Sequence, residues 1–190
     1  MLSGKRIILG VTGGIAAYKA AFLLRELQKN GAEVRVAMTP SATRFVGIDT
    51  FASLSRHEVA VDIFPGSSSS HESWTRHIEW GEWADLFVIA PCTGNTLAKI
   101  VNGQSDNMLT STVLAARCPL LVCPTMDGQM YQAPATQNNL QQAKQFGYHI
   151  LEPEEGYLAS GLEGKGRLPE IDTILERCHQ LLTKKKMMAH

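Results

Sequence analysis

The chain has 190 residues, of which 44% are hydrophobic and 19% charged, as in an ordinary globular domain. Its 18 basic and 18 acidic side chains cancel, so composition gives no electrostatic reason to expect nucleic acid or a membrane surface as a partner. No apolar run approaches the length of a membrane span. We therefore expect a single domain that binds a small neutral or anionic ligand through local geometry.

Strand-like and helix-like patterns alternate along the chain. The apolar run at 6–11 predicts a strand, 15–30 has helical periodicity, and 33–38 predicts a second strand. Further on, strands are predicted at 85–91, 119–124 and 149–151, and helices at 94–102, 106–116, 136–146 and 170–183. Such alternation is typical of parallel sheets. We predict a three-layer α/β/α domain over residues 1–183 and a solvated tail at 184–190.

Two stretches show no regular pattern. Residues 65–75, within which lies "PGSSSSHES", are Ser-rich and predict a flexible loop. Residues 152–170, "EPEEGYLASGLEGKGRLPE", carry four glycines and are long for a connection inside a compact domain. Loops of this kind are lids over ligands or disordered segments, and both interpretations remain open.

The four cysteines show no metal-ligand or redox spacing. Cys92, Cys118 and Cys123 lie within or beside apolar runs, and Cys178 falls in the last predicted helix. They are typical of reduced core residues, which favours a cytoplasmic location and predicts no metal site.

The first turn, "GVTGGIAAYK" at 10–19, leaves a strand and enters a helix, where backbone N–H groups converge on an anion. It matches neither a dinucleotide fingerprint nor a P-loop. Thr39 stands where a dinucleotide site has an acid, and a hydroxyl can donate to a phosphate. This indicates a mononucleotide phosphate pocket, with flavin mononucleotide (FMN) as the leading ligand. A turn that uses Gly13 and Gly14 only for close packing is the alternative.

A second polar stretch, "APCTGNTLAKI" at 90–100, follows the strand predicted at 85–91. Thr93, Asn95 and Thr96 lie at the carboxyl end of that strand, where open α/β sheets bind ligands. Thr93 or Asn95 could instead cap the next helix, and both roles can hold together.

Seven motifs occur together and in order: "GVTGGIAAYK", "MTPSATRF", "HIEWGEWADLFVIAP", "TGNTLAKI", "SDNMLTS", "PTMDGQMY" and "ASGLEGKGR". In this arrangement, over about residues 5–180, the chain resembles the flavin-containing cysteine decarboxylases. The resemblance implies a Rossmann-like fold, FMN as cofactor, and trimers or dodecamers with the flavin at a subunit interface. By matching positions it assigns flavin contacts to Thr12, Gly13, Gly14, Thr39, Phe45, Thr93, Gly94, Asn95, Thr96 and Thr125.

The resemblance also implies an activity. It is strongest to the members of the family that convert 4′-phosphopantothenoylcysteine, a phosphorylated cysteine conjugate, to 4′-phosphopantetheine in coenzyme A biosynthesis. It makes His77 the catalytic base, since an imidazole titrates near neutral pH. The ligase that bacterial homologues often carry after this domain is expected as a separate protein or a further part of the product. Substrate contacts are assigned to Asp127, Met130, Ala159, Gly161, Arg167 and Glu170.

The family chemistry explains the use of a flavin for a decarboxylation. A carboxylate on a saturated carbon has no electron sink, so the cysteine side chain is first oxidised to a thioaldehyde. Carbon dioxide then leaves to give an enethiolate. In the coenzyme A enzymes the hydride is returned, and a Cys on the flexible loop supplies the proton. The cofactor carries the hard step, while protein groups orient and protonate.

At the position of that donor Cys this chain has Ser160. An alcohol is a much weaker acid than a thiol, whose reference pKa is about 8.5. Direct donation by Ser160 would be slower unless the hydroxyl relays a proton from water or a neighbour.

A second departure is Asp127, where the family has an Asn that hydrogen-bonds the departing carboxylate. Two carboxylates at about 4 Å repel by about 4 kcal/mol at an effective dielectric near 20, so one would hold a proton. A protonated Asp127 could donate as Asn does. Alternatively, Asp127 turns away to cap the next turn.

Three functions remain open. The first is a carboxy-lyase that makes the reduced product. The second is an oxidative decarboxylase of a C-terminal peptidyl cysteine that stops at the enethiol, for which loss of the donor Cys would be natural. The third is a non-catalytic FMN-binding regulatory subunit. The presence of His77 and of the clamp around Arg167 favours the first.

Overall fold

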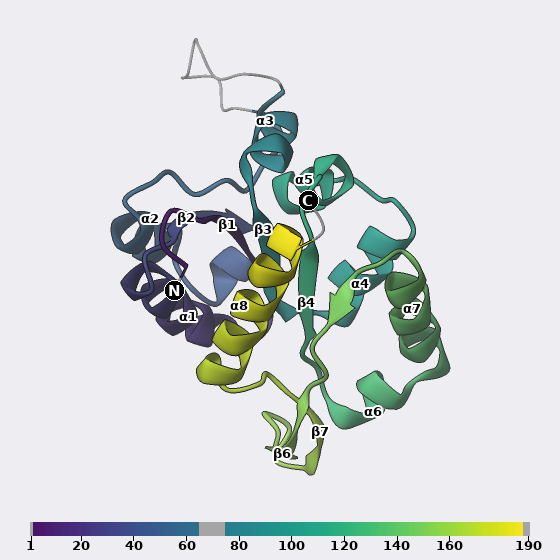
Figure 1. Cartoon of the computed structure of the whole chain (residues 1–190). Helices are drawn as coiled ribbons and strands as arrows, with labels where there is room; N and C mark the ends of the chain where they lie inside the picture. The colour runs from purple at the N-terminus through teal and green to yellow at the C-terminus, as the bar shows by residue number, and fades with distance from the viewer. Residues whose placement is uncertain (1, 65–74, 188–190) are drawn as a thin grey trace.

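The computed structural model describes residues 2–64 and 75–187, and its centre is a five-stranded parallel sheet (Figure 1). The strands stand in the order β2-β1-β3-β4-β5. Their bounds are β1 Arg6–Val11, β2 Glu33–Met38, β3 Leu86–Cys92, β4 Leu120–Pro124 and β5 His149–Ile150. The predicted parallel α/β sheet is confirmed.

Two helical layers cover the sheet. The helices are α1 Ala17–Lys29, α2 Ile48–Ser55, α3 Arg76–Trp83, α4 Gly94–Val101, α5 Met108–Ala115, α6 Gly128–Gln132, α7 Pro134–Gln145 and α8 Ile171–Met187. Alternate β1 side chains point to opposite faces. Ile7 and Leu9 pack with α1, α2 and α8, whereas Ile8 packs with α3, α4, α5 and α7. Because each face has its own apolar core, the fold is the predicted three-layer, Rossmann-like domain.

The strand order creates a ligand edge. β1 pairs with β2 on one side and with β3 on the other, so the chain reverses its direction of winding at β1. In open parallel sheets the crevice at such a reversal, outside the carboxyl ends of the strands, is where ligands bind. The turns that follow β1, β3 and β4 meet at this edge.

The segment 152–170 is more regular than the sequence indicated. It contains an antiparallel hairpin, β6 Glu154–Tyr157 and β7 Glu163–Arg167, which we call the lid hairpin (residues 154–167). Figure 1 shows it projecting at the end of the molecule opposite α3. Its glycines hid the strand pattern, because Gly lacks a side chain to give alternation.

Other differences lie at element ends and in short helices. Periodicity did not predict α2, α3 or α6, which have eight, eight and five residues. α8 continues to Met187, past the boundary predicted at 183. The flexible loop predicted at 65–75 lies outside the described residues except for its last residue, and 188–190 of the predicted tail also lie outside them.

The lid hairpin is fixed to the sheet by a close backbone contact. The Met126 N–H donates to the Gly166 carbonyl at 3.0 Å, just after β4 ends. A Cβ on Gly166 would lie 2.0 Å from the Met126 oxygen, so only glycine fits between the two backbones. The root of the hairpin is therefore held against the ligand edge.

All four cysteines are buried thiols outside any disulfide. Burial raises the pKa of the Cys92 and Cys178 thiols to about 12 and also raises that of Cys123. Among the helices in the described part of the chain, none is long and apolar enough to span a membrane.

Candidate active site

One cavity of about 500 Å³ opens at the ligand edge, within the size range of small-molecule sites. Its walls come from the first turn and α1, from the ends of β3 and β4, and from the lid hairpin. The lining residues are Gly14, Ile15, Ala16, Tyr18, Lys19, Pro91, Thr125, Met126, Asp127, Tyr157, Leu158, Ala159, Ser160, Gly166, Arg167 and Leu168. Six predicted site residues therefore meet here: Gly14, Thr125, Asp127, Ala159, Ser160 and Arg167.

The first turn has the features of a phosphate site. A Cβ on Gly13 would lie 2.4 Å from the Ser41 Oγ, so the turn approaches that hydroxyl closely. The Thr39 and Ser41 hydroxyls are 3.1 Å apart. No side chain of the described residues caps the N-terminus of α1, which leaves its first N–H groups for an anion. Backbone donors and two hydroxyls are the donor set that a phosphate monoester requires.

Thr12 anchors the first turn, which follows β1, and its side chain is fully buried. Its hydroxyl donates to the Pro91 carbonyl at 2.8 Å and accepts from the Thr93 N–H at 3.0 Å. These bonds join the end of β1 to the end of β3, so the Thr12 side chain positions the two turns that border the cavity.

At the start of α4, Thr93 caps the helix, as one of the two predicted roles of Thr93 and Asn95 required. The Thr93 hydroxyl accepts from the Thr96 N–H at 3.3 Å and so caps the helix. Gly94 lies beside Met126, because a Cβ on it would be 3.6 Å from the Met126 Sδ. Asn95 is exposed, and Thr96 is buried. This turn adjoins the cavity through Met126.

Asp127 and Ser160 lie in contact. Asp127 is the N-cap of α6, where its Oδ1 accepts from the Gln129 N–H at 3.1 Å. The Ser160 hydroxyl donates to its Oδ2 at 2.6 Å. The bond from Ser160, followed by that from Gln129, holds the pKa of Asp127 below its usual value. The structure therefore has the capping conformation of Asp127, with an ionised carboxylate.

Arg167 is bound by two acids. Its guanidinium Nη2 donates to Glu154 at 3.0 Å and to Glu170 at 2.8 Å. Its Nε is buried without a hydrogen-bond partner. The predicted clamp residues Arg167 and Glu170 are thus joined, and the Arg167 Nε is a donor without a partner among the described residues.

The root of the lid hairpin carries a charged cluster around Glu152. Its carboxylate accepts from the Tyr131 hydroxyl, from Lys144 at 3.0 Å and from Lys165 at 3.1 Å. Partial burial acts to raise the pKa of Glu152, but these bonds outweigh burial and lower the pKa to about 2. The cluster joins α6, α7 and β7 in one place.

We expect Glu152→Gln to destabilise the protein at neutral pH and to remove part of its acid sensitivity. A carboxylate with a depressed pKa stabilises the fold above its unfolded value near 4.5 and loses that contribution as the pH falls toward 2. Since the side chain is 44% exposed, screening limits the effect to about 1 kcal/mol. Urea unfolding should show a difference from wild type that shrinks as the pH is lowered below 4.5. Glu155→Gln, a change of an exposed acid on β6, is the control, and an equal loss there would contradict this role.

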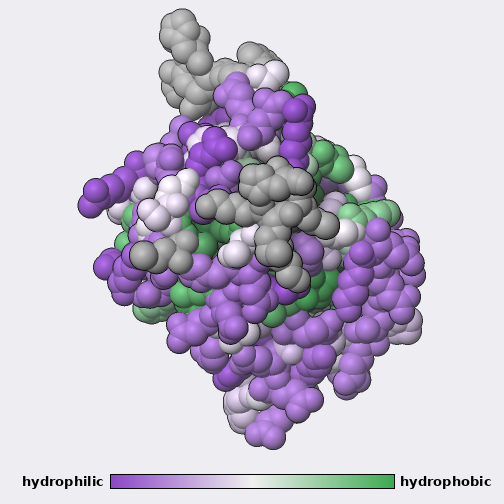
Figure 2. All heavy atoms as spheres, viewed as in Figure 1, coloured by the Kyte–Doolittle hydropathy of each residue, from purple (hydrophilic) through white to green (hydrophobic). Residues whose placement is uncertain are grey.

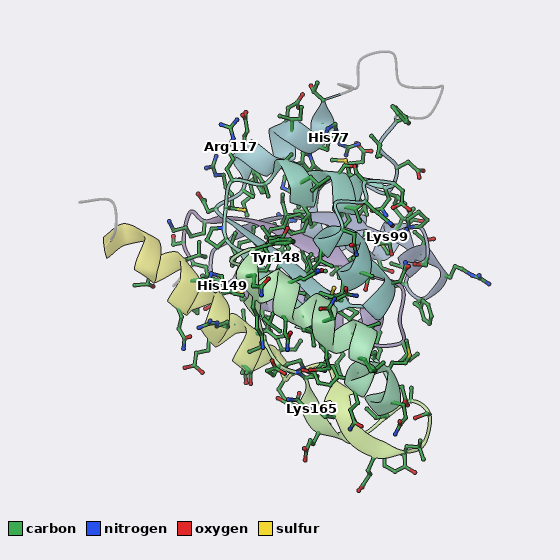
Figure 3. All side chains as sticks on the ribbon, turned by 90° about the vertical axis from the view of Figure 1, so that its right-hand side faces the viewer. His77, Lys99, Arg117, Tyr148, His149 and Lys165 are labelled. Carbon is green, nitrogen blue, oxygen red and sulfur yellow. The ribbon has the colours of Figure 1, made fainter. Side chains whose placement is uncertain are left out.

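His77 lies away from the cavity. It sits in the first turn of α3, and Figure 3 places it at the end of the molecule opposite Lys165 of the lid hairpin. Its Nδ1 is buried and has no hydrogen-bond partner. α3 is packed closely on α5, since a Cβ on Gly81 would lie 2.6 Å from the Ala115 oxygen. A single chain therefore holds His77 rigidly but does not bring it to the cavity.

The remaining predicted residues lie outside the cavity wall. Phe45 and Met130 are 49% and 55% exposed, and Gly161 is exposed at the tip of the lid hairpin. Figure 2 shows a mostly hydrophilic surface over the end where this hairpin projects. Sequence reasoning missed several residues of the site: Ser41, Tyr18, Lys19, Tyr157 and Leu158. All three of Ser41, Tyr18 and Lys19 lie inside quoted motifs. The available signal was the position of Tyr18 and Lys19 one helical turn after the glycines and that of Ser41 two residues after Thr39.

A parallel sheet with a phosphate-ready first turn and a lidded cavity at the same edge defines a mononucleotide-binding α/β protein. The family model described as Flavoprotein matches residues 1–183. The chain belongs to this Flavoprotein family.

Named relatives agree with this assignment. The chain is 47% identical over 176 residues to the "Coenzyme A biosynthesis bifunctional protein CoaBC" of Bacillus subtilis (strain 168), which covers 93% of this chain and 43% of that protein. It is 39% identical over 175 residues to the protein of the same name from Escherichia coli (strain K12), covering 92% of this chain and 42% of that one. The chain thus spans less than half the length of these relatives.

Solved structures show the same fold. A PPC decarboxylase mutant complexed with pantothenoylaminoethenethiol superposes with a TM-score of 0.83 at 32% identity, covering 93% of this chain and 97% of that one. The FMN-dependent cysteine decarboxylase SpaF gives a TM-score of 0.81 at 30% identity, covering 97% and 98%.

Proposed function

We propose that this chain is an FMN-dependent carboxy-lyase that converts 4′-phosphopantothenoylcysteine to 4′-phosphopantetheine in coenzyme A biosynthesis. The observation that carries the proposal is the cavity in which the first turn of a Flavoprotein-family chain meets Asp127, Ser160 and Arg167 of the predicted substrate clamp. The names of the relatives, which include coenzyme A biosynthesis proteins and a PPC decarboxylase, support it.

The residues at the ligand edge fit FMN. Gly13, Gly14 and the hydroxyls of Thr39 and Ser41 would hold its phosphate, because the turn combines free N–H groups with two hydroxyls. Thr125 and Met126 would border the ring, since both line the cavity. When bound, the flavin would supply hydride chemistry that no side chain can perform. Thr12, Thr93, Gly94, Asn95, Thr96 and Phe45 remain predicted contacts.

The protein's own groups bind, orient and move protons. Arg167, fixed by Glu154 and Glu170, lines the cavity, where its positive charge would orient an anionic substrate. His77 would accept the proton that leaves as the cysteine side chain is oxidised. The lid hairpin would exclude water, since Tyr157, Leu158 and Ala159 form one wall of the cavity.

We further propose that the chain works as a trimer or as a dodecamer. His77 lies far from the cavity of its own chain, so a second copy would have to supply it. Ile15, Tyr18 and Phe22 are 60%, 51% and 60% exposed and lie on one side of the start of α1. An apolar stripe beside the cavity mouth is where a neighbouring copy would pack and complete the site.

The phosphopantothenate–cysteine ligase would be a separate protein or a further part of the product, since the relatives named bifunctional are longer than this chain. A cytoplasmic location is supported by four buried cysteines that form no disulfide.

Incubating the flavin-loaded protein with 4′-phosphopantothenoylcysteine should yield a product that has lost carbon dioxide alone, followed by mass spectrometry. Loss of carbon dioxide together with two hydrogens would instead identify an oxidative decarboxylase, which the absence of a donor thiol at Ser160 makes the second candidate. The same assay with a C-terminal peptidyl cysteine separates the substrate classes. No turnover of either compound by protein that retains its flavin would contradict both activities and leave a regulatory flavin-binding role.

A further inference from the structure

The two residues at which this chain departs from its family are bonded to each other. Asp127 and Ser160 are 33 positions apart, yet the Ser160 hydroxyl donates to the Asp127 carboxylate at 2.6 Å inside the cavity wall. The other carboxylate oxygen accepts from the Gln129 N–H. With both oxygens occupied as acceptors, the resting carboxylate is ionised, in agreement with its lowered pKa.

Binding of the proposed substrate would change the protonation of Asp127. This inference therefore rests on the proposed function. The substrate carries a carboxylate, and the clamp would place it against the Asp127 carboxylate. Two ionised carboxylates in contact repel, and the arrangement of lowest energy shares one proton between them. A proton must therefore enter with the substrate.

Other charged or titratable groups face the same space. Tyr18 and Lys19 come from α1, Tyr157 from β6 and Arg167 from β7. Arg167 already neutralises Glu154 and Glu170, so its charge is shared between two acids. Lys19 is a second cation on the cavity wall, where it follows the first turn.

We propose that Asp127 and Ser160 form one proton relay: Asp127 takes up a proton as the substrate carboxylate enters, and Ser160 passes it to the carbon that loses carbon dioxide. In place of a donor thiol, the pair supplies an acid, Asp127, that carries a proton only while the substrate is bound.

The steps balance in atoms and charge. When the bond to the carboxylate breaks, its electron pair forms the carbon–carbon double bond of the enethiolate, with the negative charge on sulfur. A new C–H bond then forms as the Ser160 O–H breaks, and Ser160 recovers a proton from Asp127. The substrate becomes a neutral thioaldehyde and Asp127 returns to a carboxylate. Departure of carbon dioxide removes the charge that held the proton on Asp127, so the transfer follows decarboxylation.

Calorimetric titration of the flavin-loaded protein with two non-reacting ligands tests the uptake step. One is 4′-phosphopantothenoylalanine, which keeps the carboxylate and lacks the thiol, and the other is its decarboxylated ethylamide. The titrations are run at about pH 6 in buffers of different ionisation enthalpy. Wild type should take up a proton when it binds the alanine compound and none when it binds the ethylamide. Asp127→Asn should abolish the uptake, and Glu163→Gln, which removes an exposed acid from the same hairpin, should not.

Product analysis tests the transfer step. Asp127→Asn and Ser160→Ala should each shift the product toward the enethiol, and the double change Asp127→Asn with Ser160→Cys should restore the reduced product. Binding of the alanine compound without proton uptake by wild type would overturn the relay and leave the proposed function standing. Failure of that compound to bind at all would overturn both. An unchanged product from Asp127→Asn would also overturn the relay.

Discussion

His77→Asn is expected to lower kcat by about 10²- to 10⁴-fold, the usual contribution of a general base, while the protein keeps its fold and its flavin. Asn has no titratable ring nitrogen, so it cannot accept the proton. The backbone around it should not move, because Gly81 fixes α3 against α5. Turnover of 4′-phosphopantothenoylcysteine and flavin absorbance measure the two effects.

His57→Asn is the matched control, since His57 lies 3.7 Å from Glu33 on the surface and does not line the cavity. It should leave kcat near the wild-type value. If His77→Asn does the same, His77 has no part in the chemistry.

A mixing experiment tests which chain supplies His77. Gly13→Val should prevent flavin binding, because its side chain would collide with Ser41. If each site combines the cavity of one copy with His77 of another, co-expressed His77→Asn and Gly13→Val chains should recover up to about a quarter of wild-type activity, as random assembly of symmetric oligomers predicts. Sites built within single chains would recover none.

Gly166→Ala is expected to reduce kcat/KM by about 10²-fold or more, because small misplacements of groups that orient a substrate have effects of this size. The added Cβ would lie 2.0 Å from the Met126 oxygen, and neither backbone can yield. β7 must then move outward and break its bond to the Met126 N–H. Hydrogen exchange at Met126 should accelerate, which separates displacement of the lid hairpin from a loss of chemistry.

Gly164→Ala provides the comparison two residues away in the same strand. A Cβ there would make ordinary contacts of 3.6 Å with Leu158 and 3.9 Å with Gly128, so it should retain most of its activity. Wild-type kinetics from Gly166→Ala would show that the close contact at Met126 is not needed for substrate turnover.

The strands β1 and β2 were predictable, and burial explains the first of them, because β1 lies inside the sheet and β2 at its edge. Residues 6–11 and 33–38 were expected as strands, and the structure has Arg6–Val11 and Glu33–Met38. A strand covered on both faces is a nearly continuous apolar run, which is easy to recognise. α6 was not predictable, since five residues beginning with Gly carry too little periodicity.

The residues of the site were largely predictable from the sequence, but the contacts and distances between them were not. Each departure, at Asp127 and at Ser160, was visible alone, and capping by Asp127 was one of two alternatives. Their mutual hydrogen bond depends on a hairpin whose glycines conceal its strands. The separation of His77 from the cavity depends on tertiary packing, which a local motif does not encode.

The burial of every cysteine has a consequence for oxidative stress. Cys92, Cys118, Cys123 and Cys178 are buried, and none of them lines the cavity. The lid hairpin carries the exposed alcohol of Ser160 and no cysteine. Peroxide and disulfides attack thiolates, and an alcohol gives them no target. This domain should therefore continue to work under oxidising conditions that would inactivate an enzyme dependent on a lid thiol.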